Sequence, residues 1–248
     1  MAKDFLNKKK TMNDKSSMLA QLGMVRNMLL RAILVLIVIF IGLTFFQDLI
    51  YLKISEPLTQ HLPKDSSMIA TGVASPFLTP LKLTFYSAIF FALPYLAIEF
   101  WNFVSPGLYK KEKMLSIGLT ITSIFLFYAG MTFAFYIVFP LIFSFFIQAA
   151  PEGVMVMTDI SNYLDFVIKL FFAFGLAFEM PIFIFALVWS GFTTTEKLAN
   201  GRPYVIIGCF VVGMLLTPPD IISQTLLAVP TWLLFEIGLL TTKIFIKN

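Results

Sequence analysis

The 248-residue sequence has few charged side chains, a single cysteine and a single histidine. Asp, Glu, Lys and Arg make up only 13% of the chain, whereas hydrophobic residues make up 58%. Soluble globular domains carry about 25% charged residues, so this composition indicates a protein that has lipid as part of its solvent. Cys209 lies in an apolar run, where a buried thiol is typical, and a lone cysteine excludes an intramolecular disulfide or a cysteine metal cluster. His61 has no second His or Cys nearby, so we expect no metal site.

Short catalytic motifs are also missing. The sequence contains no G-x-x-x-x-G-K-[ST], G-x-G-x-x-G, H-E-x-x-H or G-x-S-x-G. We therefore predict a protein that is not an enzyme, binds no cofactor and takes no energy from a nucleotide on a P-loop of its own. No pattern in the chain indicates a nucleic-acid partner.

The chain is rich instead in long apolar runs. Residues 30–46 (LRAILVLIVIFIGLTFF) are apolar on all sides with one Arg near the start, whereas strands of a membrane barrel would alternate apolar with polar residues. A helix needs roughly 20 such residues to cross a bilayer. We predict an all-α, polytopic membrane protein with about six transmembrane helices, at residues 29–46, 83–104, 115–139, 166–189, 204–216 and 223–240. The fifth is short because Pro203 and Pro218 bound it.

Lys and Arg residues are concentrated in alternate loops, although the first outer loop also carries Lys53, Lys64 and Lys82. They precede the first predicted helix, follow the second and the fourth, and end the chain, whereas residues 149–162 and 217–222 contain none. Because basic segments stay on the cytoplasmic side, we expect both termini in the cytoplasm. We treat the chain as a single transmembrane domain, with a basic cytoplasmic tail (1–17), a six-helix core (18–240) and a second cytoplasmic tail (241–248). The proline-rich loop 47–82 is expected to form a structured periplasmic cap.

Three glutamates fall inside predicted helices, namely Glu99, Glu179 and Glu236. A carboxylate at the bilayer centre costs about 2.5 to 3.5 kcal/mol on insertion scales, so such a residue is a candidate for function. Glu179 is the deepest: it either offers a polar contact to a partner or substrate, or braces the bundle beside a proline that can bend the helix. Glu99 and Glu236 lie nearer the helix ends, where a side chain reaches the headgroups, and a structural role is favoured for both. Asp165 and Lys169 are four residues apart, which predicts an ion pair on one helix face.

Several segments match, in order, the motifs of one membrane-protein family. They are 100–109 (FWNFVSPGLY) with Glu112, 174–181 (FGLAFEMP), 202–204 (RPY), 217–220 (TPPD), 223–224 (SQ) and 227–228 (LA). In the first outer loop, 57–58 (PL), 62–63 (LP), 69–71 (IAT) and Phe77 follow in matching order. From about residue 18 to residue 240 the chain resembles the TatC family, the signal-peptide receptor of the twin-arginine protein translocase. The family's six helices with both termini in the cytoplasm agree with the charge distribution.

The resemblance implies a receptor and scaffold in the bacterial inner membrane, in contact with its lipids. It would work with TatA and TatB, in an assembly with several TatC copies, and export folded proteins under the proton-motive force. Its ligands would be N-terminal signal peptides with paired arginines, which carboxylates suit because they accept two parallel hydrogen bonds. The residues that match the family's signal-peptide site are Phe103, Pro106, Leu108, Tyr109, Glu112, Met24 and Arg26.

Other matches lie in the first outer loop and near the end of the chain. The residues that match the family's TatA and TatB contact region are Met214, Thr217 and Gln224. Thr and Gln also bond across helices in ordinary packing, so both readings stay open for them. Pro57, Phe77 and Asp220 match structural positions on the periplasmic side, and Asp220 equally suits a cap at the start of the sixth helix.

One position departs from the family. The first amphipathic segment of the family usually reads H-L-x-E-L-R, whereas residues 21–26 here read QLGMVR, so Met24 replaces an acidic residue. Glu112 remains as the anionic candidate, with Asp14 the nearest acid upstream, and our hypothesis is a reduced or altered affinity for paired-arginine signals. Two alternatives stay open. One is a proton-coupled small-solute transporter with the three membrane glutamates as a relay, although no span is visibly interrupted as in many transporters. The other is a scaffold paralogue that binds no signal peptide.

Overall fold

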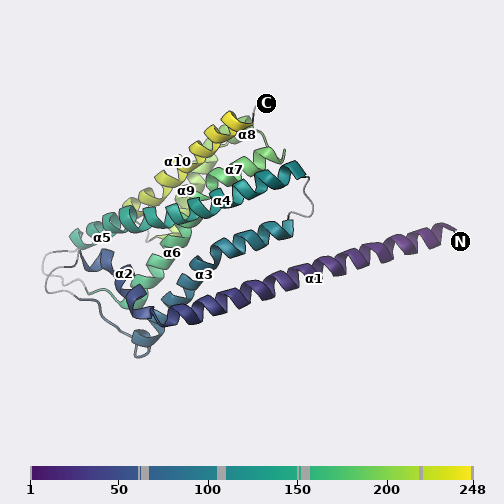
Figure 1. Ribbon diagram of the computed structural model, residues 1–248. Helices are drawn as coiled ribbons and strands as arrows, with labels where there is room; N and C mark the ends of the chain where they lie inside the picture. Colours follow the sequence, from purple (N-terminus) through teal and green to yellow (C-terminus); the bar gives the residue numbers. More distant parts are fainter. Residues whose placement is uncertain are drawn as a thin grey trace. The chain divides into compact units, whose positions relative to one another are not determined.

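The computed structural model describes residues 2–60, 62, 67–104, 110–149, 151, 157–217 and 220–246, with the backbone alone for residues 2–22, 100–104 and 110–116. Regular structure in these ranges is helical, apart from one isolated bridge between Ile69 and Asp159. The helices are α1 (Ala2–Thr44), α2 (Gln47–Thr59), α3 (Ser75–Val104), α4 (Lys110–Phe133), the π-helix η2 (Ala134–Val138), α5 (Phe139–Gln148), α6 (Ile160–Phe178), α7 (Met180–Trp189), α8 (Thr195–Asn200), α9 (Arg202–Leu216) and α10 (Ile221–Phe245) (Figure 1). The prediction of an all-α fold is confirmed.

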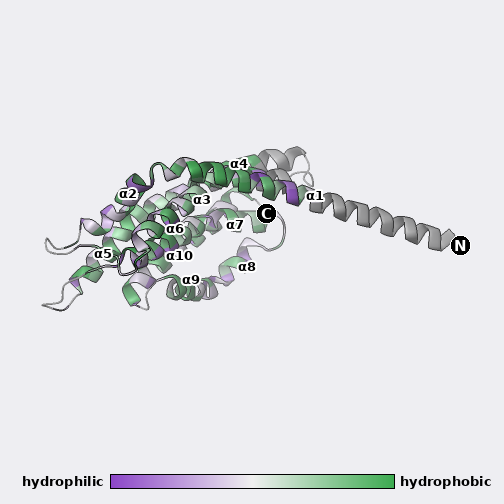
Figure 2. Ribbon diagram, turned by 90° about the horizontal axis from the view of Figure 1, so that it is seen from below, coloured by the Kyte–Doolittle hydropathy of each residue, from purple (hydrophilic) through white to green (hydrophobic). Residues whose placement is uncertain are grey.

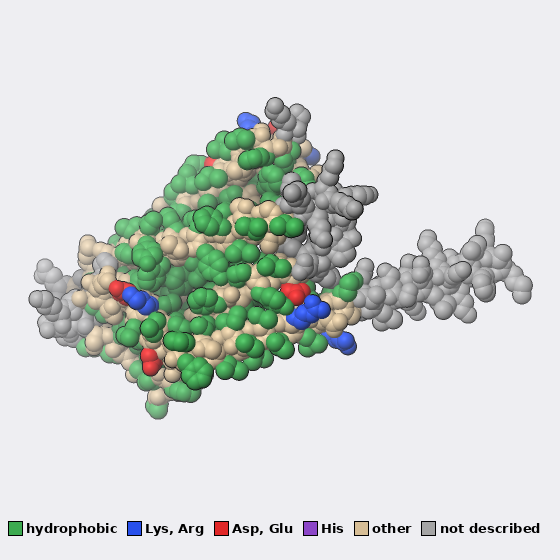
Figure 3. Space-filling model, viewed as in Figure 1, with side chains coloured by type: hydrophobic (Ala, Val, Ile, Leu, Met, Phe, Trp, Pro, Cys, Tyr) green, Lys and Arg blue, Asp and Glu red, His purple; other side chains and the backbone are tan. Residues whose placement is uncertain are grey.

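Five segments are long and apolar enough to cross a membrane, and α9 is a shorter apolar helix. The five are Gly23–Thr44, Ser75–Glu99, Ile117–Gln148, Ile160–Trp189 and Ile221–Phe245. Figure 2 shows hydrophobic residues along these helices, and in Figure 3 hydrophobic side chains are spread over the described part of the visible face, with few charged side chains among them. The 15 residues of α9 are about 22 Å long at 1.5 Å per residue, less than a hydrocarbon core of about 30 Å. The prediction of six spans with a short fifth is confirmed.

The chain divides into two compact units. The first comprises Met1–Phe45 and Ser87–Thr120, and the second comprises Phe46–Tyr86 and Ile121–Asn248. Within the second unit, α10 packs against α7 and α9, and α2 packs against α5. The hydrophobic faces of these helices are therefore partly covered by one another.

Two of the spans are not regular α-helices, and in each the irregularity lies directly before a proline. In the third span the π-helical η2 precedes α5, where Pro140 has no N–H to donate to the carbonyl four residues back. In the fourth span α6 ends at Phe178, and Glu179 donates its N–H to the carbonyl of Leu176 at 3.1 Å. The helix resumes as α7 with Pro181 in its first turn. The helix is therefore broken at Glu179, directly before the proline that was expected to disturb it, and the expectation that no span is interrupted is wrong.

The helix of the second span begins earlier than predicted. α3 starts at Ser75 rather than at residue 83, and Pro76 and Pro80 belong to its first turns. Proline suits this place because its fixed φ is helical and the first N–H groups of a helix have no acceptor within it. The Oγ1 of Thr84 donates to the carbonyl of Pro80 at 2.8 Å. The segment predicted as a cap thus contains the helix α2 and the start of α3.

Aromatic rings fill the core of the second unit. The ring of Phe139 is fully buried, and its centroid lies 5.0 Å from that of Phe171 in an edge-to-face arrangement. Tyr163 is also buried, and its hydroxyl donates to the carbonyl of Ile54 in α2 at 2.7 Å. Buried aromatic residues contribute large apolar area, and the tyrosine hydroxyl finds the partner that burial requires. This contact ties α6 to α2.

Two glycines let α4 and α6 approach closely. A Cβ at Gly130 would lie 2.4 Å from the carbonyl oxygen of Phe174, and a Cβ at Gly175 would lie 2.6 Å from the ring of Phe127. Small residues at a membrane helix crossing permit such backbone contact. Glycine at Gly130 therefore allows the close backbone approach, and glycine at Gly175 leaves room for the ring of Phe127.

Candidate functional site

The residues that match the family's signal-peptide site are described only in part. Pro106, Leu108 and Tyr109 lie outside the described residues, and Phe103 and Glu112 are described by backbone alone, in the last turn of α3 and the first turn of α4. The other two residues of this set, Met24 and Arg26, lie in α1. Met24 is 49% exposed, and Nη2 of Arg26 donates to Oδ1 of Asn27 at 3.2 Å. This contact is exposed and joins adjacent residues of the chain.

Three residues of the first unit form a polar cluster near the end of α3. The hydroxyl of Tyr95 donates to Oε1 of Glu99 at 2.9 Å, and Nη1 of Arg31 in α1 lies 3.5 Å from the same oxygen. The side chain of Glu99 is 14% exposed, whereas that of Arg31 is 65% exposed. The arginine therefore compensates the charge of a carboxylate at the end of a membrane span.

Sequence reasoning missed this ion pair because it weighed Glu99 alone. A signal for it was present: Arg31 lies near the predicted start of the first span, and Glu99 lies near the predicted end of the second. Because successive spans cross the membrane in opposite directions, the start of the first and the end of the second fall at the same membrane face. Two opposite charges at the same depth in the membrane indicate that Arg31 and Glu99 can form an ion pair.

Glu179 has a specific partner inside the membrane. Its Oε2 accepts a hydrogen bond from Oγ of Ser123 in α4 at 2.7 Å. The turn between α6 and α7 directs the carboxyl group toward α4, so one side-chain contact joins the third and fourth spans. The sequence alone did not indicate Ser123, because serine occurs in many membrane helices without a distinguishing pattern.

Asp165 pairs with a residue of another helix. Its carboxylate contacts Nζ of Lys82 in α3, so the predicted pair with Lys169 is wrong. The reason is that α3 and α6 lie side by side here, as the 2.9 Å contact between the hydroxyls of Thr79 and Ser161 demonstrates. Lys169 is exposed, and no ion pair involves it among the contacts of the described residues. A tertiary contact thus replaces the local one.

Asp159 joins the first outer loop to the start of α6. Its Oδ1 accepts from the backbone N–H groups of Ser161 and Asn162, which caps the helix. Its Oδ2 accepts from the hydroxyl of Thr71 at 2.6 Å and from the N–H of Thr71 at 2.9 Å. The hydroxyl of Thr71, followed by these backbone groups, lowers the pKa of Asp159 from its ordinary value of 3.8 to about 2. The bridge at Ile69 adds a backbone connection at the same place.

Glu236 in α10 is bound in a fork by Arg202 at the start of α9. Nε donates to Oε1 at 2.6 Å, and Nη2 donates to Oε2 at 3.0 Å. Two parallel hydrogen bonds to one carboxylate are the strong geometry for arginine. Glu236 therefore braces α9 against α10, in line with the structural role that its sequence position favoured.

The residues that match the TatA and TatB contact region differ in exposure. Met214 is 54% exposed on α9, whereas Thr217 is buried and its Oγ1 donates to the carbonyl of Gly213 at 2.9 Å. A Cβ at Gly213 would meet the backbone of Gln224 at 3.4 Å, so α9 and α10 are in close contact here. Asp220 caps α10, since its Oδ1 accepts from the N–H of Ser223 at 2.7 Å.

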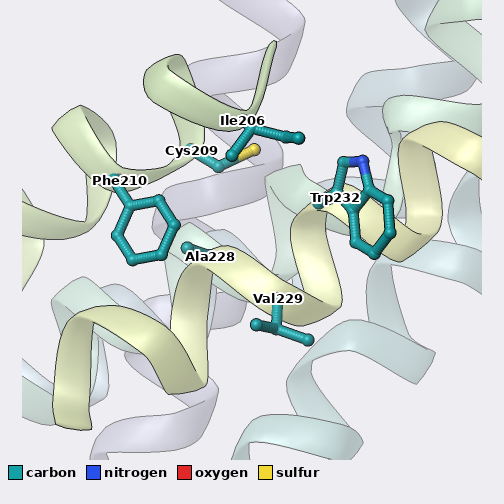
Figure 4. Close-up of a pocket in the computed structure, with 6 residues that line it drawn as sticks. All are labelled: Ile206, Cys209, Phe210, Ala228, Val229 and Trp232. Atoms are coloured by element: carbon teal, nitrogen blue, oxygen red, sulfur yellow. The ribbon is translucent and has the colours of Figure 1, made fainter. Parts of the chain in front are cut away.

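A small apolar cavity lies between α9 and α10. It encloses about 100 Å³, and its lining residues are Ile206, Cys209, Phe210, Ala228, Val229 and Trp232 (Figure 4). Nε1 of Trp232 is buried and has no hydrogen-bond partner among the described residues. The lining of the cavity is almost entirely apolar.

The remaining predicted positions concern the first outer loop and metals. Pro57 is buried inside α2, and Phe77 is exposed in the first turn of α3. His61 lies outside the described residues. Among the residues that are described, no group of three or more His, Cys, Asp or Glu is placed to hold a metal ion.

Comparison with known families decides what these features belong to. The family model described as Sec-independent protein translocase protein (TatC) matches residues 20–230. The chain belongs to the TatC family. The family predicted from the motifs is therefore confirmed.

The similarity to individual TatC proteins extends over nearly their whole length. The Sec-independent protein translocase protein TatC of Azotobacter chroococcum mcd 1 is 54% identical over 221 residues, which is 89% of this chain and 87% of that protein. TatC of Escherichia coli strain K12 is 49% identical over 236 residues, 95% of this chain and 92% of that protein. A crystal structure of the twin-arginine translocase receptor TatC superposes with a TM-score of 0.78 at 31% identity, over 90% of this chain and 98% of that one. The TatC fold and its six spans are thus shared.

Proposed function

We propose that this TatC family member is the signal-peptide receptor and scaffold of a twin-arginine protein translocase. The observation that carries the proposal is the match to TatC over residues 20–230, supported by the likeness to a structure described as the twin-arginine translocase receptor. The role is recognition and assembly rather than covalent chemistry. The proposal assigns no catalytic residue, cofactor or metal to the chain.

The proposal places the chain in the bacterial inner membrane with both termini in the cytoplasm. Its support is the alternation of basic loops, with Lys and Arg before the first span, after the second and fourth, and at the end of the chain. In this orientation α2 and the Asp159 contacts lie on the periplasmic side, and α8 lies on the cytoplasmic side. We keep the division into a single transmembrane domain with residues 1–17 and 241–248 as cytoplasmic tails.

In this role the signal peptide binds around the loop between the second and third spans. The family match assigns to this site Phe103, Pro106, Leu108, Tyr109 and Glu112, with Arg26 nearby. Glu112 receives a guanidinium of the paired arginines, for which a carboxylate is the matched acceptor. Met24 offers no charge where the family has an acid, so affinity for the signal depends on other carboxylates.

The partners TatA and TatB are proposed to bind along α9 and α10. Met214 is exposed there, and the apolar cavity beside Trp232 offers space for a side chain of a partner helix. Thr217 and Gln224 lie within the packed contact of the two helices, so they act by holding its shape. Glu179, bound to Ser123, is the polar group that a partner would meet inside the membrane. Export of folded cargo is driven by the proton-motive force in an assembly with several TatC copies.

The arrangement of the membrane glutamates does not favour a proton-coupled transporter. Glu99 binds Tyr95 and Arg31, whereas Glu179 binds Ser123. Glu236 is held by the arginine fork at the start of α9. Each carboxylate thus has its own partner, and among the described contacts of α6, α7 and α10 no hydrogen bond joins Glu179 to Glu236.

The test is binding of a twin-arginine signal peptide to the full chain in membranes with TatA and TatB. We expect cross-linking of the paired-arginine peptide and loss of cross-linking for a paired-lysine peptide, because lysine cannot form the two-bond fork. Glu112→Gln is expected to lower cross-linking, whereas Glu196→Gln, at an exposed site in α8, leaves it unchanged. Equal cross-linking of both peptides would indicate a scaffold without signal binding. Met24→Glu is expected to raise cross-linking if the missing acid limits affinity.

A further inference from the structure

The ion pair between Arg31 and Glu99 has a longer distance and fewer hydrogen bonds than the pair between Arg202 and Glu236. Arg202 donates two hydrogen bonds, of 2.6 and 3.0 Å, to the two carboxylate oxygens of Glu236. Arg31 makes one contact of 3.5 Å with Glu99, to the oxygen that already accepts from Tyr95. The first pair has the two-bond fork of a strong arginine–carboxylate contact, whereas in the second the described side chains use only one oxygen of the carboxylate.

Glu99 is nevertheless held in place. Tyr95 lies one helical turn before it in α3 and donates the 2.9 Å hydrogen bond that fixes the carboxylate. The second oxygen, Oε2, has no hydrogen-bond partner among the residues whose side chains the structure describes. The group is therefore an oriented anion whose second oxygen is unpaired among the described side chains, beside an arginine that is 65% exposed. A guanidinium from a ligand can form with it the fork that Arg31 does not form.

Glu99 lies against the face of α1 that carries Met24, the residue that stands where the family has an acid. Met24 and Arg31 are seven residues apart in α1, which is close to two helical turns, so they share one face at a separation of about 10 Å. Glu99 touches that face through Arg31, and it lies one turn before Phe103 in α3. No Asp or Glu occurs between Lys15 and Gln47, and Glu99 is the sole carboxylate among the described side chains of the first unit.

We propose that Glu99 is a guanidinium-binding carboxylate of the signal site, which supplies the charge that Met24 lacks, and that Arg31 occupies it until an arginine of the signal replaces it. This inference rests on the proposed function as a signal receptor. It makes Arg31 a built-in competitor, so the two partners of one ion pair have opposite effects on binding. A purely structural ion pair would give both variants the same effect.

The experiment measures binding of paired-arginine and paired-lysine signal peptides to the full chain, embedded with TatA and TatB in membrane vesicles. Glu99→Gln is expected to weaken binding of the paired-arginine peptide roughly ten- to a hundredfold, as expected for loss of a hydrogen bond to a charged group. Arg31→Gln is expected to strengthen it about two- to fivefold, the range for removal of an exposed ion pair. Glu56→Gln, which breaks the exposed pair with Lys53 in α2, is the matched control and leaves binding unchanged.

The outcomes separate the inference from the function on which it rests. If the unaltered chain binds both peptides equally, the receptor function fails. If it prefers paired arginines but Glu99→Gln binds as well as the unaltered chain, only the role of Glu99 is overturned. Weaker binding by Arg31→Gln also overturns it, since that result identifies a structural pair. Where Glu99→Gln does not accumulate in the membrane, Arg31→Gln alone decides, and only stronger binding supports the proposal.

Discussion

Oγ of Ser123 donates a 2.7 Å hydrogen bond to Oε2 of Glu179, and this contact joins α4 to the turn that separates α6 from α7. The turn exists because Pro181 cannot continue the hydrogen-bond ladder of the preceding helix. A carboxyl group at a helix break in the membrane needs a partner, and the serine of the neighbouring span provides one. The interrupted fourth span is thus fixed to the third by a side chain.

Ser123→Ala is expected to destabilise the protein by about 1–3 kcal/mol, because the carboxyl group of Glu179 loses its hydrogen-bond donor in a partly buried site. Thermal unfolding in detergent micelles measures the change. Glu179→Gln is expected to cost less, since its amide oxygen still accepts from Ser123. The control is Ser144→Ala in α5, which removes only the contact with Gln148 on an exposed helix face. A Ser123→Ala variant as stable as that control would show that the bond contributes nothing.

Gly130→Ala is expected to destabilise the crossing of α4 and α6 by about 1–3 kcal/mol, the usual cost of overpacking. The added Cβ would lie 2.4 Å from a backbone carbonyl of α6, which cannot move aside as a flexible side chain can. Gly208→Ala in α9 is the matched control, because no atom lies within 4 Å of its Cβ position. Unfolding temperatures should therefore fall for the first variant and stay level or rise for the second. The same temperature for both would contradict the close approach.

Asp159→Asn separates the two tasks of Asp159. The single amide oxygen of asparagine still caps α6, but the amide nitrogen is a donor and cannot accept from Thr71. We expect faster hydrogen exchange at the N–H of Thr71 and unchanged exchange at Ser161. Thr71→Val, which removes the hydroxyl and keeps the N–H, should have a smaller effect at the same amide. Unchanged protection of Thr71 in Asp159→Asn would rule out this link between loop and helix.

The Asp159 contacts are expected to resist mild acid. Because the pKa of this group is lowered in the folded state to about 2, the stabilisation is fully present above the ordinary value of 3.8 and is lost as pH falls through about 2. Hydrogen exchange at the N–H of Thr71, corrected for the intrinsic pH dependence, should therefore show constant protection from pH 7 to pH 4. Loss of protection between pH 7 and pH 5 would be inconsistent with the lowered pKa.

Hydropathy predicts the spans well because the bilayer sets the length of an apolar helix. The short α9 was predicted from the prolines at residues 203 and 218, and the bend at Glu179 from Pro181. Pro76 and Pro80 suggest a loop and so predict a late start for α3, although proline is compatible with the first turn of a helix, and α3 begins at Ser75. Features that depend on neighbours along the chain, such as helix ends, can therefore be predicted from the sequence. The exception is proline, which is found both in loops and in the first turn of a helix.

The pairing of charged side chains was harder to predict, since it depends on which helices lie side by side. Sequence spacing predicts an ion pair between Asp165 and Lys169, whereas in the structure Asp165 pairs with Lys82 of α3. Sequence reasoning likewise treated Glu99 as an isolated residue, whereas Arg31 comes to it from a distant part of the chain. Such contacts require the arrangement of helices, which one sequence does not contain.

A double-mutant cycle distinguishes the two partners of Asp165. With Lys82→Met, Asp165→Asn and the double variant, we expect a coupling energy of about 0.2–1 kcal/mol, as is typical of partly exposed ion pairs. The corresponding cycle with Lys169→Met should give a coupling near zero, because no contact joins Lys169 to Asp165 among the described residues. Lys169 is the matched control, since it is a lysine of the same helix face as Asp165. Thermal unfolding in micelles supplies the free energies, and a larger coupling to Lys169 than to Lys82 would restore the local pair and refute the packing of α3 beside α6 at this point.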